Sequence, residues 1–230
     1  MALLIGEEGL AKLARATVAV FGIGGVGSFA VEALARAGIG HLVLVDPDSI
    51  EKSNINRQLH ATVNTIGQSK VLVMKERILN INPAVKIEAR RERYTPEHGA
   101  TLIRPDYTYI IDAVDDVSAK VDLIVRAKES NIPIISSMGA GNRLNASGFC
   151  IADISETSGC PLARVLRRRL RKLGITTGVK VVFSPEPPLK LTYNQNGQGS
   201  RPPGPGSISF VPPVAGLLMA GECVRDLLRD

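Results

Sequence analysis

The sequence contains no tryptophan, and its three cysteines lie far apart without any Cys-x-x-Cys pair. Neither a disulfide framework nor a four-thiolate zinc site is therefore expected. The chain also lacks an amino-terminal basic region followed by an apolar core, so we predict no export signal and a cytoplasmic location. The longest apolar stretch, 208–220, contains two prolines and is shorter than the roughly 20 residues of a membrane-spanning helix, so no membrane association is expected.

A glycine-rich turn is the most informative feature that is present. The segment 20–28 reads VFGIGGVGS, follows an apolar run typical of a buried strand, and opens a helical pattern. Glycine lets the backbone turn tightly and approach a phosphate, while the start of a helix directs unpaired N–H groups at the anion. The spacing predicts a nucleotide site but does not identify the reaction. The predicted phosphate-binding residues are Gly22, Gly24, Gly25 and Gly27.

Strand and helix patterns alternate along most of the chain, which predicts an α/β fold with a Rossmann-like, doubly wound and mostly parallel sheet. The predicted strands are 17–21, 42–46, 84–89, 108–112 and 132–137, and the predicted helices are 26–37, 69–80 and 117–129. These elements form a nucleotide-binding core that we place at residues 1–145.

The alternation changes after about residue 145, and we assign residues 146–230 to a carboxyl-terminal extension of the same domain. Two additional strands, 149–154 and 179–183, flank a basic helix over 161–173 and are expected to run antiparallel at the sheet edge. The segment 194–206 is rich in glycine, proline and amides, which predicts a flexible loop. A helix over 213–228 is expected to pack on the core.

Polar residues follow the second predicted strand and narrow the chemistry. Asp46 ends that strand 24 residues after Gly22, where a carboxylate can accept hydrogen bonds from a ribose. An NAD dehydrogenase would fit equally well up to this point. The segment 47–58 then places amide, hydroxyl and guanidinium groups beside the turn, for which a hydride-transfer enzyme has little use.

Cleavage of ATP at its α-phosphate concentrates negative charge on phosphoryl oxygens and pyrophosphate, so the site needs fixed cations and a metal. We predict that Arg57 contacts phosphate oxygens, that Lys70 neutralises pyrophosphate, and that Asp115 binds Mg²⁺. Each residue has a structural alternative, because single cations are usually solvated and an Asp before a helix is usually a cap. Their common position near the carboxyl edge of the sheet favours the catalytic interpretation.

Five motifs in this order point to one superfamily. They are Gly22-x-Gly24-Gly25-x-Gly27-Ser28, Asp46-x-Asp48, Ser53-Asn54-x-x-Arg57-Gln58, Gly67-x-x-Lys70 and Asp112-x-x-Asp115. Over residues 5–140 the chain resembles the adenylating superfamily that includes ubiquitin-activating enzymes and the molybdopterin and thiamine sulfur-carrier activators. With the turn glycines, the resemblance implies an ATP site made of Asp46, Asp48, Ser53, Asn54, Arg57, Gln58, Lys70, Asp115 and Asp116.

Three further segments extend the resemblance to the carboxyl terminus. They are Gly141-Asn142-Arg143, the sequence CPLARV at 160–165, and GSISFVPPVAG at 206–216. Within the superfamily they resemble the tRNA threonylcarbamoyladenosine dehydratases. This implies a homodimer that uses ATP and Mg²⁺ to activate the threonine carboxylate of the modified adenosine beside the anticodon, after which a ring closes with net loss of water. Because adenylation already supplies a good leaving group, no essential cysteine is required.

The helix predicted over 161–173 carries six cations and no acid, in a chain with a formal net charge of +6. Like charges one helical turn apart repel each other by a few tenths of a kcal/mol per pair, roughly. A solvated amphipathic helix is the alternative, but contact with tRNA phosphates explains the charge better. Its leucines 162, 166, 170 and 173 recur at helical spacing and are expected to pack. The predicted tRNA-binding residues are Arg164, Arg167, Arg168, Arg171 and Lys172.

Two other functions remain open from the sequence. One is an adenylating enzyme for a ubiquitin-like sulfur carrier, with contacts to sulfur-relay proteins and Cys160 as a thiol acceptor; the missing Cys-x-x-Cys pairs argue against it. The other is a non-catalytic nucleotide-binding scaffold. Relatives also usually carry an arginine segment before Leu-Leu-Ile-Gly, whereas this sequence begins Met1-Ala2-Leu3-Leu4. We expect upstream residues to be missing, with substitution by Arg15 as the alternative.

Overall fold

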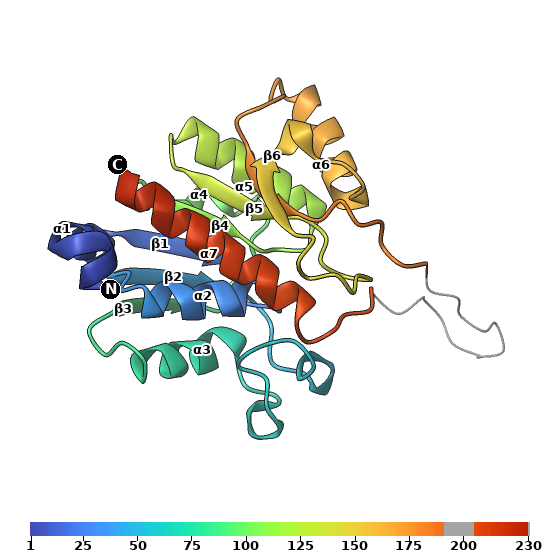
Figure 1. Cartoon of the computed structure of the whole chain (residues 1–230). Coiled ribbons are helices and arrows are strands. Elements are labelled where there is room, and N and C mark those ends of the chain that lie inside the picture. Colours follow the sequence, from blue (N-terminus) through green and yellow to red (C-terminus); the bar gives the residue numbers. More distant parts are fainter. Residues whose placement is uncertain (191–204, 230) are drawn as a thin grey trace.

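In the part of the chain that the structure describes, seven strands form one sheet in the order β3-β2-β1-β4-β5-β7-β6, with helices on both faces (Figure 1). The computed structural model describes residues 1–190 and 205–229, so residues 194–204 of the predicted loop lie outside the described part. All neighbouring strands are parallel except β6 and β7. The Rossmann-like α/β fold predicted from the alternating pattern is confirmed.

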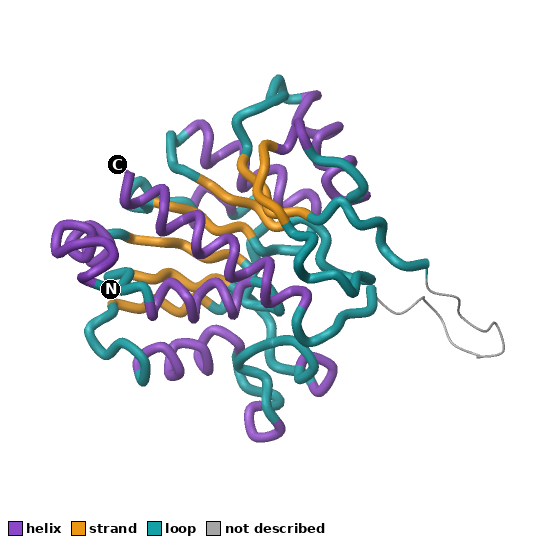
Figure 2. Tube along the Cα trace, viewed as in Figure 1, coloured by secondary structure: helices purple, strands orange, loops and turns teal. Residues whose placement is uncertain are grey.

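The core strands alternate with helices along the chain, as Figure 2 shows. The strands are β1 (Thr17–Phe21), β2 (His41–Val45), β3 (Lys86–Arg90), β4 (Tyr109–Asp112), β5 (Ile134–Ser137), β6 (Cys150–Asp153) and β7 (Lys180–Phe183). The α-helices are α1 (Ala2–Arg15), α2 (Gly27–Arg36), α3 (Lys70–Leu79), α4 (Gly99–Leu102), α5 (Val117–Glu129), α6 (Pro161–Lys172) and α7 (Val211–Arg229). The short 3₁₀ helices are η1 (Lys52–Asn54), η2 (Val63–Thr65) and η3 (Ile154–Glu156).

The central strands are apolar on both faces because each face is covered. Val18 and Val20 of β1 belong to a core layer with α2, α3 and α7, whereas Ala19 and Phe21 belong to a second layer with α5 and α6. Successive side chains of a strand point to opposite faces, so a continuous apolar run fills both layers. Because the core strands are parallel, their carboxyl ends lie at one edge of the sheet, where the ligand crevice of such sheets lies.

The carboxyl-terminal strands correct one expectation. Both were expected to run antiparallel, but β7 pairs parallel with β5, and only β6 at the edge is antiparallel. The antiparallel strand β6 carries the chain back across the sheet, so that β7 starts at the same end of the sheet as β5 and can pair with it in parallel.

The helices contain further differences from the sequence prediction. The helix α1, with a kink at Gly6, was not predicted. The helix α7 begins at Val211 and accommodates Pro212 and Pro213, because proline is tolerated in a first turn where its missing N–H has no helical partner. Leu173 was expected to pack, but it follows the end of α6 and is 57% exposed. No helix within 1–190 or 205–229 is long and apolar enough to span a membrane.

Candidate nucleotide-binding site

A cavity of about 520 Å³ lies at the carboxyl ends of the parallel strands, and it gathers most of the residues predicted for ATP. Its walls come from the turn after β1, the loop after β2, the start of α3 and the loop after β4. The segments around Gly141 and Ser207 complete it from the carboxyl-terminal part. The predicted residues that line it are Gly22, Gly24, Gly25, Asp46, Asp48, Asn54, Arg57, Gln58, Lys70, Asp115 and Asp116.

Glycine is needed at different positions of the turn for different physical reasons. Gly22 has φ +85°, and a Cβ there would lie 2.6 Å from the Ala113 carbonyl oxygen, so the close approach of two loops requires glycine. A Cβ at Gly27 would collide with the Gly22 carbonyl oxygen, and Gly27 therefore supports the turn without lining the cavity. At Gly24 the nearest described atom to such a Cβ is Gln58 Nε2 at 3.8 Å, which leaves the backbone open to a ligand.

Asp46 joins the turn to the loop after β2. Its Oδ2 accepts a hydrogen bond from Ile23 N at 2.7 Å, and its Oδ1 accepts one from Asp48 N at 2.9 Å. Burial raises the pKa of Asp46, and the Lys70 ammonium 4.0 Å from Oδ1 acts in the opposite direction. The carboxylate thus holds two cavity walls together at the position where the sequence predicts a ribose contact.

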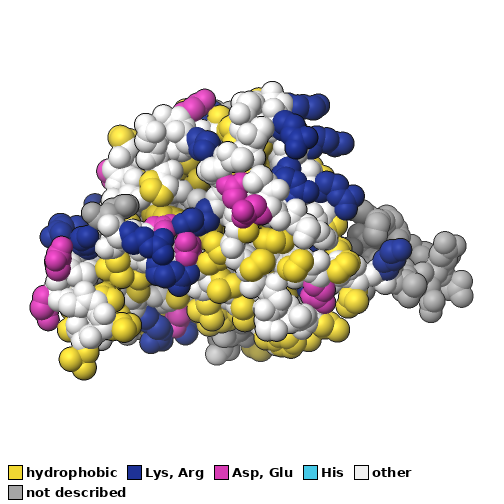
Figure 3. All heavy atoms as spheres, turned by 45° about the horizontal axis from the view of Figure 1, so that its top comes forward, with side chains coloured by type: hydrophobic (Ala, Val, Ile, Leu, Met, Phe, Trp, Pro, Cys, Tyr) yellow, Lys and Arg dark blue, Asp and Glu magenta, His cyan; other side chains and the backbone are white. Residues whose placement is uncertain are grey.

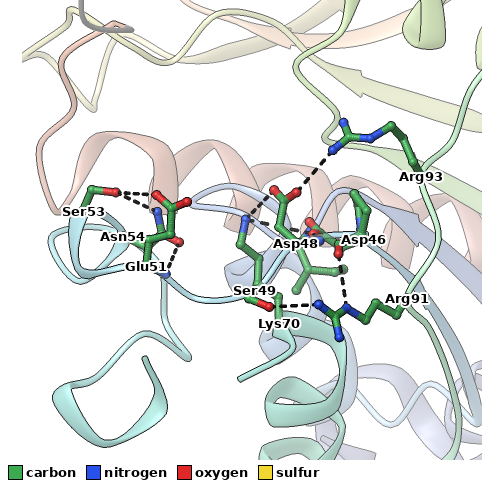
Figure 4. Close-up of polar contacts among 11 residues, drawn as sticks. Asp46, Asp48, Ser49, Glu51, Ser53, Asn54, Lys70, Arg91 and Arg93 are labelled. Atoms are coloured by element: carbon green, nitrogen blue, oxygen red, sulfur yellow. Dashed lines mark hydrogen bonds and ion pairs between the residues drawn. The ribbon is translucent and has the colours of Figure 1, made fainter. Parts of the chain in front are cut away.

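Lys70 is the first residue of α3, and its buried ammonium is paired inside the cavity (Figure 4). Its Nζ lies 2.9 Å from Asp48 Oδ2, and Arg93 approaches the other Asp48 oxygen at 3.5 Å. Arg91 donates to Ser49 Oγ at 3.1 Å on the same side. The β3 side of the cavity therefore carries Arg93, a cation that was not among the predicted ATP-site residues.

Arg57 is held beside the glycine turn by two hydrogen bonds from a single nitrogen. Its Nη1 donates to the Ser53 carbonyl oxygen and to Asn56 Oδ1, both at 2.9 Å. Its stem packs on the turn, because a Cβ at Gly25 would lie 3.2 Å from Arg57 Cγ. The guanidinium is fixed in direction by these contacts, and it lines the cavity.

The other residues of the Ser53-Asn54-x-x-Arg57-Gln58 motif differ in their positions relative to the cavity. Asn54 Oδ1 accepts the Glu51 N–H at 3.1 Å and caps η1, and Asn54 also lines the cavity. Ser53 donates to Glu51 Oε2 at 3.2 Å and lies outside the cavity wall, as Figure 4 shows for this local network. Gln58 is buried, and its Oε1 has no hydrogen-bond partner among the described residues, so a ligand donor would satisfy it.

The two acids after β4 have different surroundings. Asp116 is the N-cap of α5 and accepts the Ala119 N–H at 2.7 Å, as the structural alternative predicted. Asp115 is exposed and lines the cavity, with no hydrogen bond or ion pair to another described residue. Within 1–190 and 205–229 no three His, Cys, Asp or Glu side chains form a metal cluster. The donor set suits Mg²⁺ held by one carboxylate and phosphate oxygens better than a metal enclosed by protein ligands alone.

Lys120 is a residue of this region that the sequence argument missed. Its Nζ is 2.9 Å from Asp112 Oδ2 beneath the cavity, and both side chains are essentially inaccessible to solvent. Asp112 also accepts hydrogen bonds from Ser136 Oγ at 2.5 Å and from Val114 N at 3.2 Å. Asp112 is therefore engaged in supporting the loop that carries Asp115. The sequence did contain a signal for this residue, because Lys120 stands among the apolar residues of the buried face of α5.

The chain is similar in sequence and in fold to known proteins. The family model described as "ThiF family" matches residues 1–230. The chain belongs to the ThiF family. It is 46% identical to the tRNA threonylcarbamoyladenosine dehydratase of Bacillus subtilis (strain 168) over 99% of this chain and 93% of the relative. A crystal structure of Escherichia coli tRNA N6-threonylcarbamoyladenosine dehydratase in complex with ATP superposes with a TM-score of 0.91 at 35% identity, covering 99% of this chain and 92% of that chain.

A different member of the adenylating group is similar over a shorter range. The sulfur carrier protein adenylyltransferase of Thermus thermophilus is 38% identical over 49% of this chain and 41% of its own length. The resemblance to the adenylating superfamily inferred from the motifs is thus confirmed, including the resemblance to the dehydratases.

The basic helix of this ThiF-family chain packs through Ala163, Leu166 and Leu170 and exposes cations on the other side. Figure 3 shows Lys and Arg side chains gathered at the upper right, over the position of α6 in Figure 1. The predicted residues that are exposed are Arg164, Arg168, Arg171 and Lys172, none with an ion pair to a described acid.

Two arginines of α6 contact protein groups instead. Arg167 is half-buried and donates to the Thr157 carbonyl oxygen at 2.7 Å, so this predicted tRNA ligand also joins the middle of α6 to the residue that follows η3. Arg169 donates to Ser118 Oγ at 3.0 Å in the first turn of α5, two residues after Asp116. The basic helix is therefore close to the cavity side of α5. Arg15 lies at the other end of β1, at the sheet edge opposite to the cavity.

Proposed function

We propose that this chain is an ATP-dependent tRNA threonylcarbamoyladenosine dehydratase. The observation that carries the proposal is the match along nearly the whole chain to relatives with that activity in their names. The cavity supports it, because groups suited to phosphate, ribose and metal surround one space at the carboxyl edge of the sheet. A tRNA substrate would also place the enzyme in the cytoplasm.

The proposed reaction has two steps, adenylation of the carboxylate and closure of the ring. A carboxylate oxygen of the threonyl group attacks the α-phosphorus of ATP, the bond to the bridging oxygen breaks, and pyrophosphate leaves. A nucleophile of the carbamoyl group in the same nucleoside then attacks the acyl carbon and loses its proton, while AMP leaves with the former carboxylate oxygen. The second step is intramolecular and therefore requires little beyond positioning and activation of the leaving group. The nucleoside has lost one water overall.

Charge stabilisation is the main contribution of the protein to both steps. Arg57 directs a fixed guanidinium into the cavity, and Lys70 supplies a buried ammonium that Asp48 pairs before phosphates bind. Fixed cations need little reorganisation as charge develops in the transition state. The open backbone at Gly24 receives phosphate oxygens, and Asp46 accepts from ribose hydroxyls. Bound Mg²⁺ would neutralise phosphate charge, and Asp115 is the residue that would hold it.

The direct test incubates the protein with ATP, Mg²⁺ and tRNA that carries threonylcarbamoyladenosine. The tRNA is digested, and the modified nucleoside is weighed by mass spectrometry while AMP and pyrophosphate are quantified. We expect loss of one water per AMP released, and no product without Mg²⁺. An unchanged nucleoside in the complete reaction, also when an arginine-containing segment is added before Met1, would contradict the proposal. Pyrophosphate exchange driven by a sulfur-carrier protein, and contacts with sulfur-relay proteins, would then favour the alternative.

We expect the exposed face of α6 to bind tRNA phosphates. In the double variant Arg168→Ala/Arg171→Ala, tRNA affinity should fall about tenfold and the salt dependence of binding should weaken by about one to two contacts. Binding is measured by fluorescence anisotropy at several salt concentrations. The matched control is Arg36→Ala/Lys86→Ala, which removes two exposed cations at the opposite edge of the sheet. An equal loss in the control would show that only net charge matters.

The homodimer implied by the resemblance is also part of the proposal. Figure 3 shows hydrophobic side chains gathered over the lower half of the molecular surface in that view. Large apolar side chains that are exposed include Ile55, Phe210 and Leu217, which are 38–49% accessible, and Leu3 and Leu4 are almost fully accessible. Contact with a second copy would remove such apolar area from water. Sedimentation equilibrium should give twice the mass of the chain, and a monomer at micromolar concentration would contradict this expectation.

A further inference from the structure

Two sequence signatures that distinguish this chain within its superfamily meet in space, although nothing in the proposed mechanism uses them. They are Gly141-Asn142-Arg143 and the segment that begins at Gly206, which lies 64 residues further along the chain. Asn142 N donates to the Gly206 carbonyl oxygen at 2.7 Å, and Gly206 N donates to Asn142 Oδ1 at 2.6 Å. The Asn142 carbonyl oxygen also accepts the Leu189 N–H at 2.7 Å.

The conformation at this junction is demanding. Asn142 has φ +55°, a left-handed conformation that non-glycine residues seldom adopt, although asparagine does so more readily than most. A Cβ at Gly141 would lie 2.7 Å from Pro205 Cβ, so glycine permits the two segments to touch. Arg143 is 3% exposed and donates from Nε to the Gly139 carbonyl oxygen at 2.9 Å, which closes the same turn. The segment 139–143 is therefore a rigid clamp on 205–207.

From the clamp, a chain of hydrogen bonds leads to the cation that the proposed function needs most. Asn56 Nδ2 donates to the Ser207 carbonyl oxygen at 3.0 Å and approaches Ser207 Oγ at 3.3 Å. Asn56 Oδ1 in turn accepts from Arg57 Nη1 at 2.9 Å. Asn56 lies between Asn54 and Arg57 and was not among the residues predicted for the site. Gly141, Ser207 and Arg57 all line the cavity.

We propose that Asn142 is a positioning residue for Arg57, acting through Gly206, Ser207 and Asn56. With the clamp closed, Ser207 holds the Asn56 amide so that its oxygen faces Arg57. One guanidinium nitrogen is then occupied, and the others are directed at the phosphates. Without the clamp, Asn56 rotates freely and Arg57 keeps only the Ser53 carbonyl as a fixed partner. The inference rests on the proposed function for the identity of the reaction, but its contacts concern nucleotide phosphate alone.

The test compares ATP with adenosine by isothermal titration calorimetry in Asn142→Gly, Asn56→Ala and the double variant. Glycine is chosen at 142 because it keeps the left-handed conformation while removing the side-chain acceptor. Each single variant should weaken ATP binding about five- to tenfold and adenosine binding less than twofold, because only phosphate contacts depend on Arg57. The double variant should bind ATP as the weaker single variant does, because both changes break one chain.

Asn131→Gly is the matched control, since Asn131 is the other non-glycine residue with positive φ in the described residues, at φ 54°, and it lies outside the cavity wall. It should bind both ligands as the unaltered protein does. Multiplicative losses in the double variant, or equal losses for ATP and adenosine, would overturn the inference. If the unaltered protein binds ATP but leaves the modified nucleoside unchanged, the proposed function fails while the binding comparison still decides the role of Asn142. If it binds no ATP, both fail.

Discussion

Replacing Arg57 with alanine is expected to lower the rate constant for AMP formation by about 10²–10³-fold, a typical loss for a preorganised group that stabilises developing charge. The affinity for ATP should fall less, by about tenfold, because the ground state carries less charge at the α-phosphate than the transition state does. Both quantities are measured in the same preparation, with single-turnover AMP release for the rate constant and calorimetry for the affinity. Arg57 receives this prediction because its direction is fixed by two hydrogen bonds in the cavity wall.

Two further variants make the Arg57 result specific. Arg57→Lys keeps the charge but removes the planar fork, so it should recover only part of the rate. Lys52→Ala removes an exposed cation five residues earlier, at the start of η1, and should change neither rate nor affinity by more than about twofold. Equal losses in Arg57→Ala and Lys52→Ala would mean that general electrostatic attraction, rather than a directed guanidinium, is responsible.

Replacing Lys120 with methionine is expected to lower the free energy of unfolding by about 3–5 kcal/mol, because it leaves the buried Asp112 carboxylate without its cation. Ser136 Oγ and Val114 N would still donate to Asp112, but neither carries a charge. Urea-induced unfolding measures this loss, followed by far-ultraviolet circular dichroism because the chain has no tryptophan.

The Lys120 prediction has two controls. Lys128→Met changes an exposed lysine of the same helix and should cost under about 1 kcal/mol. Adding Asp112→Asn to Lys120→Met removes the unpaired charge and should restore about 1 kcal/mol or more, since the two sites are directly coupled. If Lys120→Met unfolds at the same urea concentration as the unaltered protein, the buried pair does not stabilise the fold.

Local sequence patterns were sufficient for the central sheet, and most of the residues that they predicted for ATP line the cavity. Each parallel strand is a short apolar run, and each helix has its own periodicity, so neighbouring residues carry the signal. The groups for phosphate and metal follow strand ends, and parallel strands end at the same edge, which predicted that Asp46, Arg57, Lys70 and Asp115 would gather. Their individual roles remain predictions, because position in a cavity wall does not by itself establish a contact with ATP.

The exceptions within the predicted site have local causes that spacing could not reveal. Ser53 belongs to the same motif as Asn54, yet it does not line the cavity, and its hydroxyl donates to Glu51 within the turn that forms η1. Gly27 belongs to the glycine motif but serves the packing of α2 on the turn. Arg167 was grouped with exposed cations, although its guanidinium is directed at Thr157. Each outcome depends on the local geometry around one residue, which the spacing of a motif does not specify.

The sequence by itself determined the fold class, the superfamily and about a dozen residues that line the cavity, because these depend on short-range periodicity and on motifs contained in single loops. Only the tertiary structure decided the parallel pairing of β7, the buried pair of Lys120 with Asp112, and the clamp of Asn142 on Gly206. These features join segments that are far apart in the chain or on different elements. Their partners are selected by burial and by the need to satisfy polar groups away from water, which no local pattern records.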